Sequence, residues 1–378
     1  MAKLGEVCLI NPKSCTLRDD TEVSFIPMTK VGEHGEFDAS EIKNYSEVKK
    51  GFTNFQNGDI LFAKITPCME NGKGAIAHNM KNGIGFGSTE FHVLRPDTDK
   101  ITSEWLYYLT TWKTFRKEAE KNMTGSAGQK RVPKTFLENY VVNLPDIDTQ
   151  KSENKILRKV DDLIFLRKQQ LSKLDELVKA RFVEMFGDPK DNRSNLVKIG
   201  EIGDLTSGGT PSRSNSEYFN GSIRWYSAGE LNSLYLPDSI EHISRTALSQ
   251  SAAKLFEKGT LMIGMYDTAA FKMGILTEQS SSNQACANLK PTEQYSVIWL
   301  YYLFDIMKPI FLNERQGVRQ KNLSLSKIRN FNIPSAPLAL QNQFAAFVER
   351  VDQQKQTVQQ SLEKLELMKK ALMQEYFG

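Results

Sequence analysis

The sequence has few of the features that mark secreted and membrane proteins. Its four cysteines are too few and too irregularly spaced for a disulfide framework. It contains no run of about 18 consecutive apolar residues, the length that a transmembrane helix needs. The opening residues lack the charged-then-apolar pattern of a signal peptide. We therefore expect a reducing, cytoplasmic location and no membrane contact.

A catalytic or metal-binding set is also missing. The four histidines are scattered and lack cysteine or carboxylate neighbours at ligand spacing. The glycine-rich stretches at 71–74 and 83–87 have the spacing of neither a P-loop nor a dinucleotide site. No DPPY-like methyltransferase tetrad and no PD-(D/E)xK nuclease pattern occurs. We expect no catalytic residue, no metal and no cofactor in this chain.

Net charge is low as well, at +4 over 378 residues. Any nucleic-acid surface must therefore be local rather than spread over the whole chain. Hydrophobic residues make up 40% and charged residues 25%, as in ordinary globular proteins. The length suggests two or three domains.

The chain contains an internal duplication. Short segments from the first half return in the same order about 190 to 195 residues later. The pairs are KLGEV at 3–7 with KIGEI at 198–202, WLYYL at 105–109 with WLYYL at 299–303, QK at 129–130 with QK at 320–321, and MFG at 185–187 with YFG at 376–378. Four matches in order indicate that one unit was copied.

Each copy ends in a predicted long helix. Apolar positions there follow alternating steps of four and three, the spacing of a helix seam, without proline or internal glycine. The apolar seam residues are Val160, Ile164, Leu171, Leu174, Val178, Val351, Val358, Leu362, Leu365 and Leu372. A narrow seam on so long a helix needs a partner, so we expect the two helices to pair as a coiled coil. The alternative is that each helix packs on its own globular half.

The segments before the helices mix short apolar runs of strand length with glycine-rich turns. We therefore predict an α/β (α+β) fold with two globular domains alternating with two long helices. The expected boundaries are 1–145 for the first globular domain, 146–188 for its helix, 189–335 for the second domain and 336–378 for its helix.

Two basic segments occupy the same place in the two copies. Residues 121–134 and 315–329 contain no acidic residue and are rich in small polar side chains. Such segments combine cations for phosphates with short hydrogen-bond donors. Their candidate DNA-binding cations are Lys130, Arg131, Lys134, Arg315, Arg319 and Lys321. The alternative is a solvated surface loop, against which the recurrence in both copies argues.

Base contacts need polar side chains held near a groove. The candidates in the first domain are Lys64, Thr66, Asn71, Lys73, Ser88 and Thr89. Those in the second domain are Arg213, Arg224, Lys272, Asn283 and Gln284. Trp225 and Tyr266 lie among them, and we expect both to be core residues.

Several of these stretches resemble a known family. In the first half they are KLGEV at 3–7, LFAKITPCMENGK at 61–73 and GSTEF at 87–91. In the second half they are GTPS at 209–212, YFNGSIRW at 218–225 and NQAC at 283–286. With the basic segments and the long helices, they resemble the target-recognition domains of type I restriction-modification specificity subunits over nearly the whole chain. The residues at 145–150, 317–319 and 337–341 depart from that family's pattern.

The resemblance implies a non-catalytic subunit that recognises a bipartite target in double-stranded DNA, one half-site per recognition domain. It implies that the helices form an antiparallel coiled coil with an internal pseudo-twofold, which sets the spacing between half-sites and docks two modification (methyltransferase) subunits. S-adenosylmethionine, ATP and Mg would then belong to partner subunits, with restriction subunits joining the complex.

Two other functions remain open from the residues. A duplicated enzyme would use Cys68 or Cys286 as its nucleophile. A coiled-coil adaptor would have no role on DNA.

Overall fold

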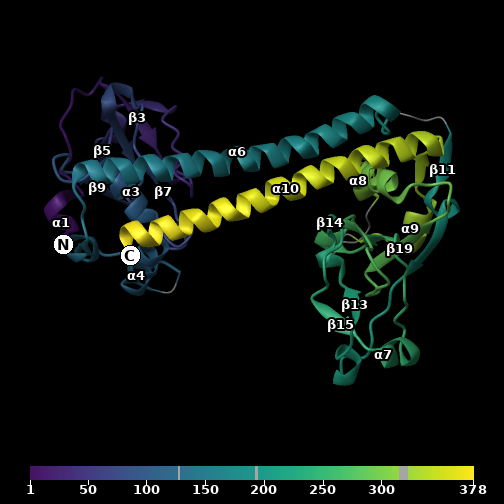
Figure 1. Cartoon of the computed structure of the whole chain (residues 1–378). Helices are drawn as coiled ribbons and strands as arrows, with labels where there is room; N and C mark the ends of the chain where they lie inside the picture. Colours follow the sequence, from purple (N-terminus) through teal and green to yellow (C-terminus); the bar gives the residue numbers. More distant parts are fainter. Residues whose placement is uncertain (127, 192–194, 315–321) are drawn as a thin grey trace. The chain divides into compact units, whose positions relative to one another are not determined.

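The computed structural model describes residues 1–126, 128–191, 195–314 and 322–378. The chain divides into two compact units (Figure 1). Unit 1 comprises Met1–Arg167 and Ser361–Gly378, and unit 2 comprises Lys168–Gln360. The boundary between the units falls inside both long helices, α6 (Ile147–Phe186) and α10 (Leu338–Phe377), so each unit contains part of each helix.

Unit 1 contains two four-stranded sheets, ordered β2-β9-β6-β7 and β4-β3-β8-β5, and a small β1-β10 pair. The strands are β1 (Ala2–Lys3), β2 (Cys8–Ile10), β3 (Glu22–Ile26), β4 (Ile42–Asn44), β5 (Thr53–Gln56), β6 (Ile60–Ala63), β7 (Gly74–Ile76), β8 (Ile84–Gly87), β9 (Phe91–Pro96) and β10 (Val141–Val142). The short helices are α1 (Leu4–Val7), α2 (Tyr45–Val48), α3 (Ser103–Thr111), α4 (Lys113–Lys121) and α5 (Lys134–Asn139), with 3-10 turns η1 (Met28–Lys30) and η2 (Lys81–Gly83).

Unit 2 repeats this plan with a sheet ordered β12-β19-β16-β17-β14, a three-stranded sheet β15-β13-β18 and a β11-β20 pair. The strands are β11 (Leu196–Lys198), β12 (Gly203–Ser207), β13 (Ile223–Tyr226), β14 (Asn232–Tyr235), β15 (Glu241–Ile243), β16 (Leu261–Gly264), β17 (Met273–Ile275), β18 (Ser281–Ser282), β19 (Cys286–Pro291) and β20 (Asn332–Pro334). The helices are α7 (Arg245–Gln250), α8 (Val297–Asn313) and α9 (Leu325–Asn330), with 3-10 turns η3 (Ile199–Glu201), η4 (Ser216–Phe219), η5 (Ala228–Glu230) and η6 (Asp267–Ala269).

The predicted α/β fold with two long paired helices is confirmed. Each long helix has 40 residues. Within unit 1, Asp161 of α6 pairs with Lys369 of α10 at 2.6 Å, and the Arg167 Nε donates to the Ser361 Oγ at 3.2 Å. Within unit 2, Asp175 pairs with Lys355. Residue numbers increase along α6 while those of its contact partners on α10 decrease, so the two helices run antiparallel in each unit.

The apolar seam lies between the paired helices. Every one of the ten predicted apolar seam residues is buried or half-buried. Leu157 and Met373 are buried together in the core of unit 1, and Val178 and Val351 in that of unit 2. The α6 and α10 segments are therefore part of the hydrophobic core of each unit and not only a link between globular domains.

One buried glutamine ties the start of each long helix to its unit. The Gln150 side chain donates to the carbonyls of Lys100 and Pro145 and accepts from the Thr102 N–H at 2.9 Å. The Gln341 side chain makes the same three bonds, to the carbonyls of Gln294 and Ala336 and from the Ser296 N–H at 2.9 Å. Because both glutamines are fully buried, these bonds satisfy carboxamide atoms that water cannot reach.

In the part of the chain that the structure describes, no helix combines the length and the apolar character needed to span a bilayer.

Candidate nucleic-acid interface

Most of the residues predicted to bind DNA lie on three segments in each unit. They are a hairpin loop, a turn between two strands, and the basic segment that precedes a short helix. In unit 1 the segments are 64–73, 88–90 and 121–134, and in unit 2 they are 265–272, 283–285 and 314–324. Residues 127 and 315–321 of the basic segments, which include the predicted Arg315, Arg319 and Lys321, lie outside the described residues.

The two hairpin loops occupy the same place in the fold. Loop 64–73 joins β6 to β7, and loop 265–272 joins β16 to β17. A backbone bond closes each loop at the same place, from the Ala63 N–H to the Lys73 carbonyl and from the Gly264 N–H to the Lys272 carbonyl. Lys73 and Lys272, chosen independently from the sequence, are therefore structural equivalents at the end of each loop.

The turn 88–90, which follows β8, and the turn 283–285, which follows β18, are also equivalent, since β8 and β18 each pair in parallel with another strand. The Ser88 Oγ accepts from the Glu90 N–H at 3.2 Å, and the Asn283 Oδ1 accepts from the Ala285 N–H at 3.0 Å. These side chains shape their turns. Thr89 and Gln284 are the central residues of these two turns, and both are exposed.

Backbone hydrogen bonds bring the three segments together. In unit 1 the Lys64 N–H donates to the Glu90 carbonyl, and the Lys64 carbonyl accepts from the Val132 N–H, both at 2.9 Å. In unit 2 Met265 makes the same two bonds, to the Ala285 carbonyl at 2.9 Å and from the Leu323 N–H at 2.8 Å. One residue per unit therefore joins the hairpin loop to both the turn and the end of the basic segment.

Unit 1 adds a further link in its basic segment. The Thr66 N–H donates to the Lys130 carbonyl at 3.0 Å, and the Thr66 Oγ1 accepts from the Lys130 N–H at 3.2 Å. Thr66 thus holds the backbone of Lys130, whose exposed ammonium has no ion pair with any described residue. Asn71 is exposed at the far end of the same loop, and the Lys73 ammonium donates to the Met28 carbonyl.

Several predicted cations are already paired with carboxylates. Arg131 makes two hydrogen bonds to Glu90, at 2.8 and 2.9 Å, and this pairing lowers the pKa of Glu90. Lys134 pairs with Glu138 at 2.9 Å, one helical turn away. The charge that these two side chains can offer to a phosphate is therefore smaller than the sequence indicates.

Arg213 and Arg224 lie on other elements of unit 2 and are also paired. Arg213 bonds Glu241 through both terminal nitrogens, and its guanidinium lies 4.3 Å from the Phe219 ring centroid. Arg224, on β13, contacts Asp238 at 2.9 Å and Glu278 at 3.0 Å. No described contact joins either arginine to the three segments of unit 2.

The hairpin loops rest on different anchors. Under loop 64–73, the buried Arg116 donates to the Met69 carbonyl at 2.7 Å and lies over the Phe62 ring. Its Nε and Nη2 have no hydrogen-bond partner among the described residues, and burial lowers the pKa of Arg116 to about 10. Loop 265–272 is anchored instead by Phe271, which is 1% exposed and stacks on Phe311 with ring centroids 4.8 Å apart.

Trp225 and Tyr266 differ in their surroundings. Trp225 is 2% exposed, and its Nε1 donates to the Gly209 carbonyl, as expected of a core residue. The expectation that Tyr266 is a core residue is wrong, because its side chain is 40% exposed beside a cavity of about 460 Å³. An exposed aromatic and a buried one cannot be told apart from the surrounding sequence alone.

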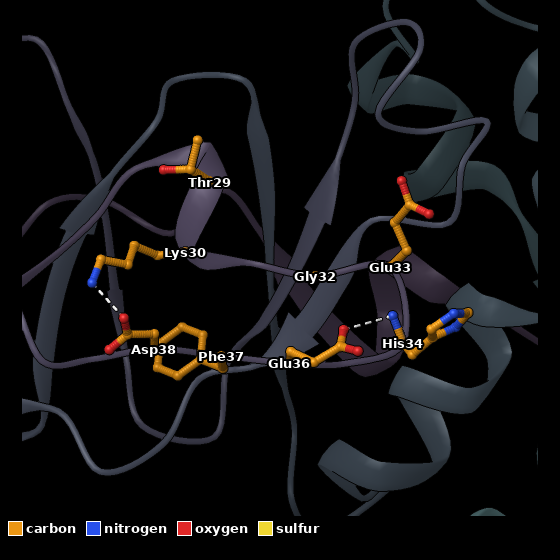
Figure 2. Close-up of a pocket in the computed structure, with 8 residues that line it drawn as sticks. All are labelled: Thr29, Lys30, Gly32, Glu33, His34, Glu36, Phe37 and Asp38. Atoms are coloured by element: carbon orange, nitrogen blue, oxygen red, sulfur yellow. Dashed lines mark hydrogen bonds and ion pairs between the residues drawn. The ribbon is translucent and has the colours of Figure 1, made fainter. Parts of the chain in front are cut away.

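A second cavity, of about 510 Å³, lies in unit 1 along the hairpin 29–38 (Figure 2). Lys30 and Asp38 form an ion pair at one end, and the Glu36 carboxylate accepts from the His34 N–H at the other. With Glu33, three carboxylates face one lysine and one histidine, so this cavity does not suit a phosphate. None of these residues was selected from the sequence.

The cysteine chemistry offers little support for an enzyme. Cys286 is fully buried, and burial raises the pKa of its thiol to about 12. It stays protonated at neutral pH, whereas a nucleophilic cysteine needs the thiolate. Cys68 is half-buried against the apolar core of unit 1. Across the described residues, no cluster of three or more histidine, cysteine or acidic side chains could hold a metal.

Comparison with known proteins gives one family. The model of the "Type I restriction modification DNA specificity domain" matches residues 1–176 and 192–367. The EcoAI specificity subunit of Escherichia coli is 46% identical over 178 residues, which cover 46% of this chain and 30% of that protein. The EcoR124I/EcoR124II specificity subunit of E. coli is 22% identical over 275 residues, 68% of this chain and 65% of that protein. The alignment with the EcoAI subunit thus spans less than a third of that relative's length.

Solved structures show the same fold. A chain from a study of complex assembly and conformational transition of the type I R-M system aligns over 99% of this chain and 96% of its own length, with a TM-score of 0.62 and 18% identity. The type I restriction-modification S subunit from M. genitalium aligns over 100% and 95%, with a TM-score of 0.59 and 14% identity. With the family model matching both copies, this chain belongs to the family of type I restriction-modification DNA specificity domains.

Proposed function

We propose that this protein is the DNA-recognition subunit of a type I restriction-modification complex, and that each unit contacts one half of a bipartite target. The observation that carries the proposal is the recurrence of the three joined segments. Met265 repeats the backbone bonds of Lys64, and Lys272 repeats the position of Lys73. Two copies of one backbone frame in one chain suit a target with two half-sites.

Several side chains of these segments suit contact with DNA. The exposed Lys130 and the half-buried Lys64 and Lys272 supply charge for phosphates, while Thr89 and Gln284 supply hydrogen bonds at the exposed turns. Phosphate contacts fix the orientation of the protein, and base contacts select the sequence.

The test is binding by the complex of this chain with modification subunits. We expect one two-part sequence to be protected, with Lys130→Ala weakening binding to all duplexes and reducing the salt dependence by about one ion. Lys100→Ala is the matched control, because Lys100 follows β9 at the end opposite the turn 88–90. Equal affinity for every sequence at each salt concentration would contradict the proposal.

We also propose that α6 docks a modification subunit. Within unit 1, Ile156, Leu163 and Leu166 are 41–54% exposed and share one face of α6 at steps of seven and three. The seam packs against α10 on a different side of the helix, so this apolar face remains available to a partner. Modification subunits would bring S-adenosylmethionine, and restriction subunits would bring ATP and Mg.

Docking is tested by co-purification. The double variant Leu163→Glu/Leu166→Glu should lose the modification subunit, because it places two charges on the apolar face. Gln169→Glu, an exposed change on the same helix, should retain it. Equal recovery of the modification subunit with both variants would show that this face is not used.

A coiled-coil adaptor without a role on DNA is the remaining candidate. It predicts that Lys64→Glu/Lys130→Glu leaves DNA binding unchanged. No contact among the described residues of either unit favours this candidate.

A further inference from the structure

Tyr266 and Gln284 are a pair of unit 2 side chains that the duplication does not explain. The residue before Tyr266 is Met265, which is equivalent to Lys64 by its backbone hydrogen bonds. Tyr266 therefore corresponds to Ile65, and Gln284 to Thr89. At these two positions the common framework presents an aromatic ring and a carboxamide in unit 2 only.

The surroundings of Tyr266 suit a flat polar ligand. The cavity of about 460 Å³ beside it is lined by Ser207, Met265, Tyr266, Gln284, Asn322, Leu323, Ser324, Leu325 and Lys327. None of these described lining residues is acidic, in contrast to the three carboxylates of the unit 1 cavity. Tyrosine presents an apolar ring surface and a hydroxyl for hydrogen bonding, so its exposed ring can contact the edge of a base pair or its sugar.

The side chain of Gln284 is oriented by a hydrogen bond from Thr210. The Thr210 hydroxyl donates to the Gln284 Oε1. The loop that carries Thr210 is itself fixed, because the Gly209 N–H donates to the Ser282 carbonyl at 2.9 Å and the Gly209 carbonyl accepts from the Trp225 Nε1 at 3.1 Å. The Gln284 Nε2 bonds no described residue, and its Oε1 keeps a second lone pair.

We propose that Gln284 and Tyr266 together recognise one adenine in the half-site bound by unit 2, an inference that rests on the proposed function. The Gln284 Nε2 donates to adenine N7, and its Oε1 accepts from the adenine N6 amino group, the pairing that a carboxamide makes in the major groove. Tyr266 contributes its exposed ring to the same contact. Thr210 is a positioning residue, since it orients the carboxamide without touching the base.

The experiment selects bound duplexes from a pool randomised across both half-sites, using the complex with modification subunits. Gln284→Ala should lower the preference for A·T at one position of the second half-site by roughly ten- to hundredfold. Gln284→Glu should replace adenine by cytosine there, because a carboxylate accepts from the cytosine N4 amino group. Tyr266→Ala should weaken binding to the selected sequence, and Tyr266→Phe should keep most of it.

Thr89→Ala is the matched control, at the equivalent turn of unit 1. It should leave the second half-site unchanged. The inference is overturned if the wild-type complex selects a bipartite sequence and both Gln284 variants select that same sequence. A wild-type complex that selects no sequence at all would instead refute the proposed function, so the two failures are distinguishable.

Discussion

The two hairpin loops share a backbone frame but differ in what holds them. Loop 64–73 lies over the buried guanidinium of Arg116, whereas loop 265–272 buries the ring of its own Phe271 against Phe311. A ring that fills the core gains apolar burial, whereas a buried charge with two unpaired nitrogens carries a desolvation cost. The backbone bonds that position the segments are repeated, while the side chains beneath them are not. The repeated backbone bonds therefore fix the position of each loop, while the side chain that anchors the loop differs between the units.

The surfaces of the units differ in the same way. Unit 1 has Lys64, Ile65 and Thr89 where unit 2 has Met265, Tyr266 and Gln284. Changes at these positions leave the repeated backbone hydrogen bonds untouched. Under the proposed function, two unlike half-sites would be recognised by one repeated backbone frame.

The largest expected effect comes from removing the aromatic anchor. Phe271→Ala should lower the free energy of unfolding by about 3–5 kcal/mol, because it empties a packed site between Phe304 and Phe311. Denaturant-induced unfolding measures this, and hydrogen exchange should show the loss within unit 2. Phe165→Ala, at a 65% exposed position, should change stability by less than about 0.5 kcal/mol. If protection from hydrogen exchange were lost equally in unit 1, the anchors of the two loops would not act independently.

Gln150 and Gln341, near the starts of α6 and α10, allow the stability of equivalent positions in the two units to be compared. Gln150→Ala and Gln341→Ala should each cost about 2–4 kcal/mol, because each removes a fully buried side chain and the three hydrogen bonds it makes to one N–H and two carbonyls. Equal costs in chemical denaturation would show that the duplication extends to energetics. A difference of more than about 2 kcal/mol would show that one helix start depends on other contacts.

A smaller effect is expected from freeing Arg131. Glu90→Gln removes the partner carboxylate, so Arg131 becomes available to phosphates. Affinity for non-specific duplexes should rise a few-fold, with a salt dependence steeper by about 0.9. Glu22→Gln, which breaks the pair with Lys81 outside the three segments, should leave both quantities unchanged. Titration of fluorescent DNA at several salt concentrations provides the measurement.

The smallest effect on stability is expected at the charged anchor. Arg116→Met removes a buried cation and keeps most of its apolar volume, so the free energy of unfolding should change by less than about 1 kcal/mol. Loop 64–73 loses the bond to the Met69 carbonyl and should exchange its amide hydrogens faster. Stability falling as far as in Phe271→Ala would show that the two anchors contribute alike after all.

The sequence predicted the fold well because its signals are periodic or repeated. The seam from Val160 to Val178 has helical spacing over several turns, and the repeats at Trp105 and Trp299 locate equivalent helices. Boundaries at 145 and 335 remain predictions, since the compact units each combine a globular part with pieces of both long helices.

The candidate site was less accessible from the sequence. Lys73 and Lys272 could be chosen as candidates, but their equivalence depends on strand register. Pairing of Arg131 with Glu90 joins positions 41 residues apart and has no local pattern. Tyr266 lies in an apolar stretch that looks like core, and only the cavity beside it shows its exposure.

The division of the units has a consequence for synthesis. Unit 2 is one uninterrupted stretch, whereas unit 1 needs Ser361–Gly378 to complete its core, where Phe377 packs 4.8 Å from Trp105. On a ribosome, the second unit to be translated can therefore finish folding before the first. Until Phe377 emerges, the nascent first unit keeps an uncovered tryptophan surface, which is the kind of surface that chaperones bind.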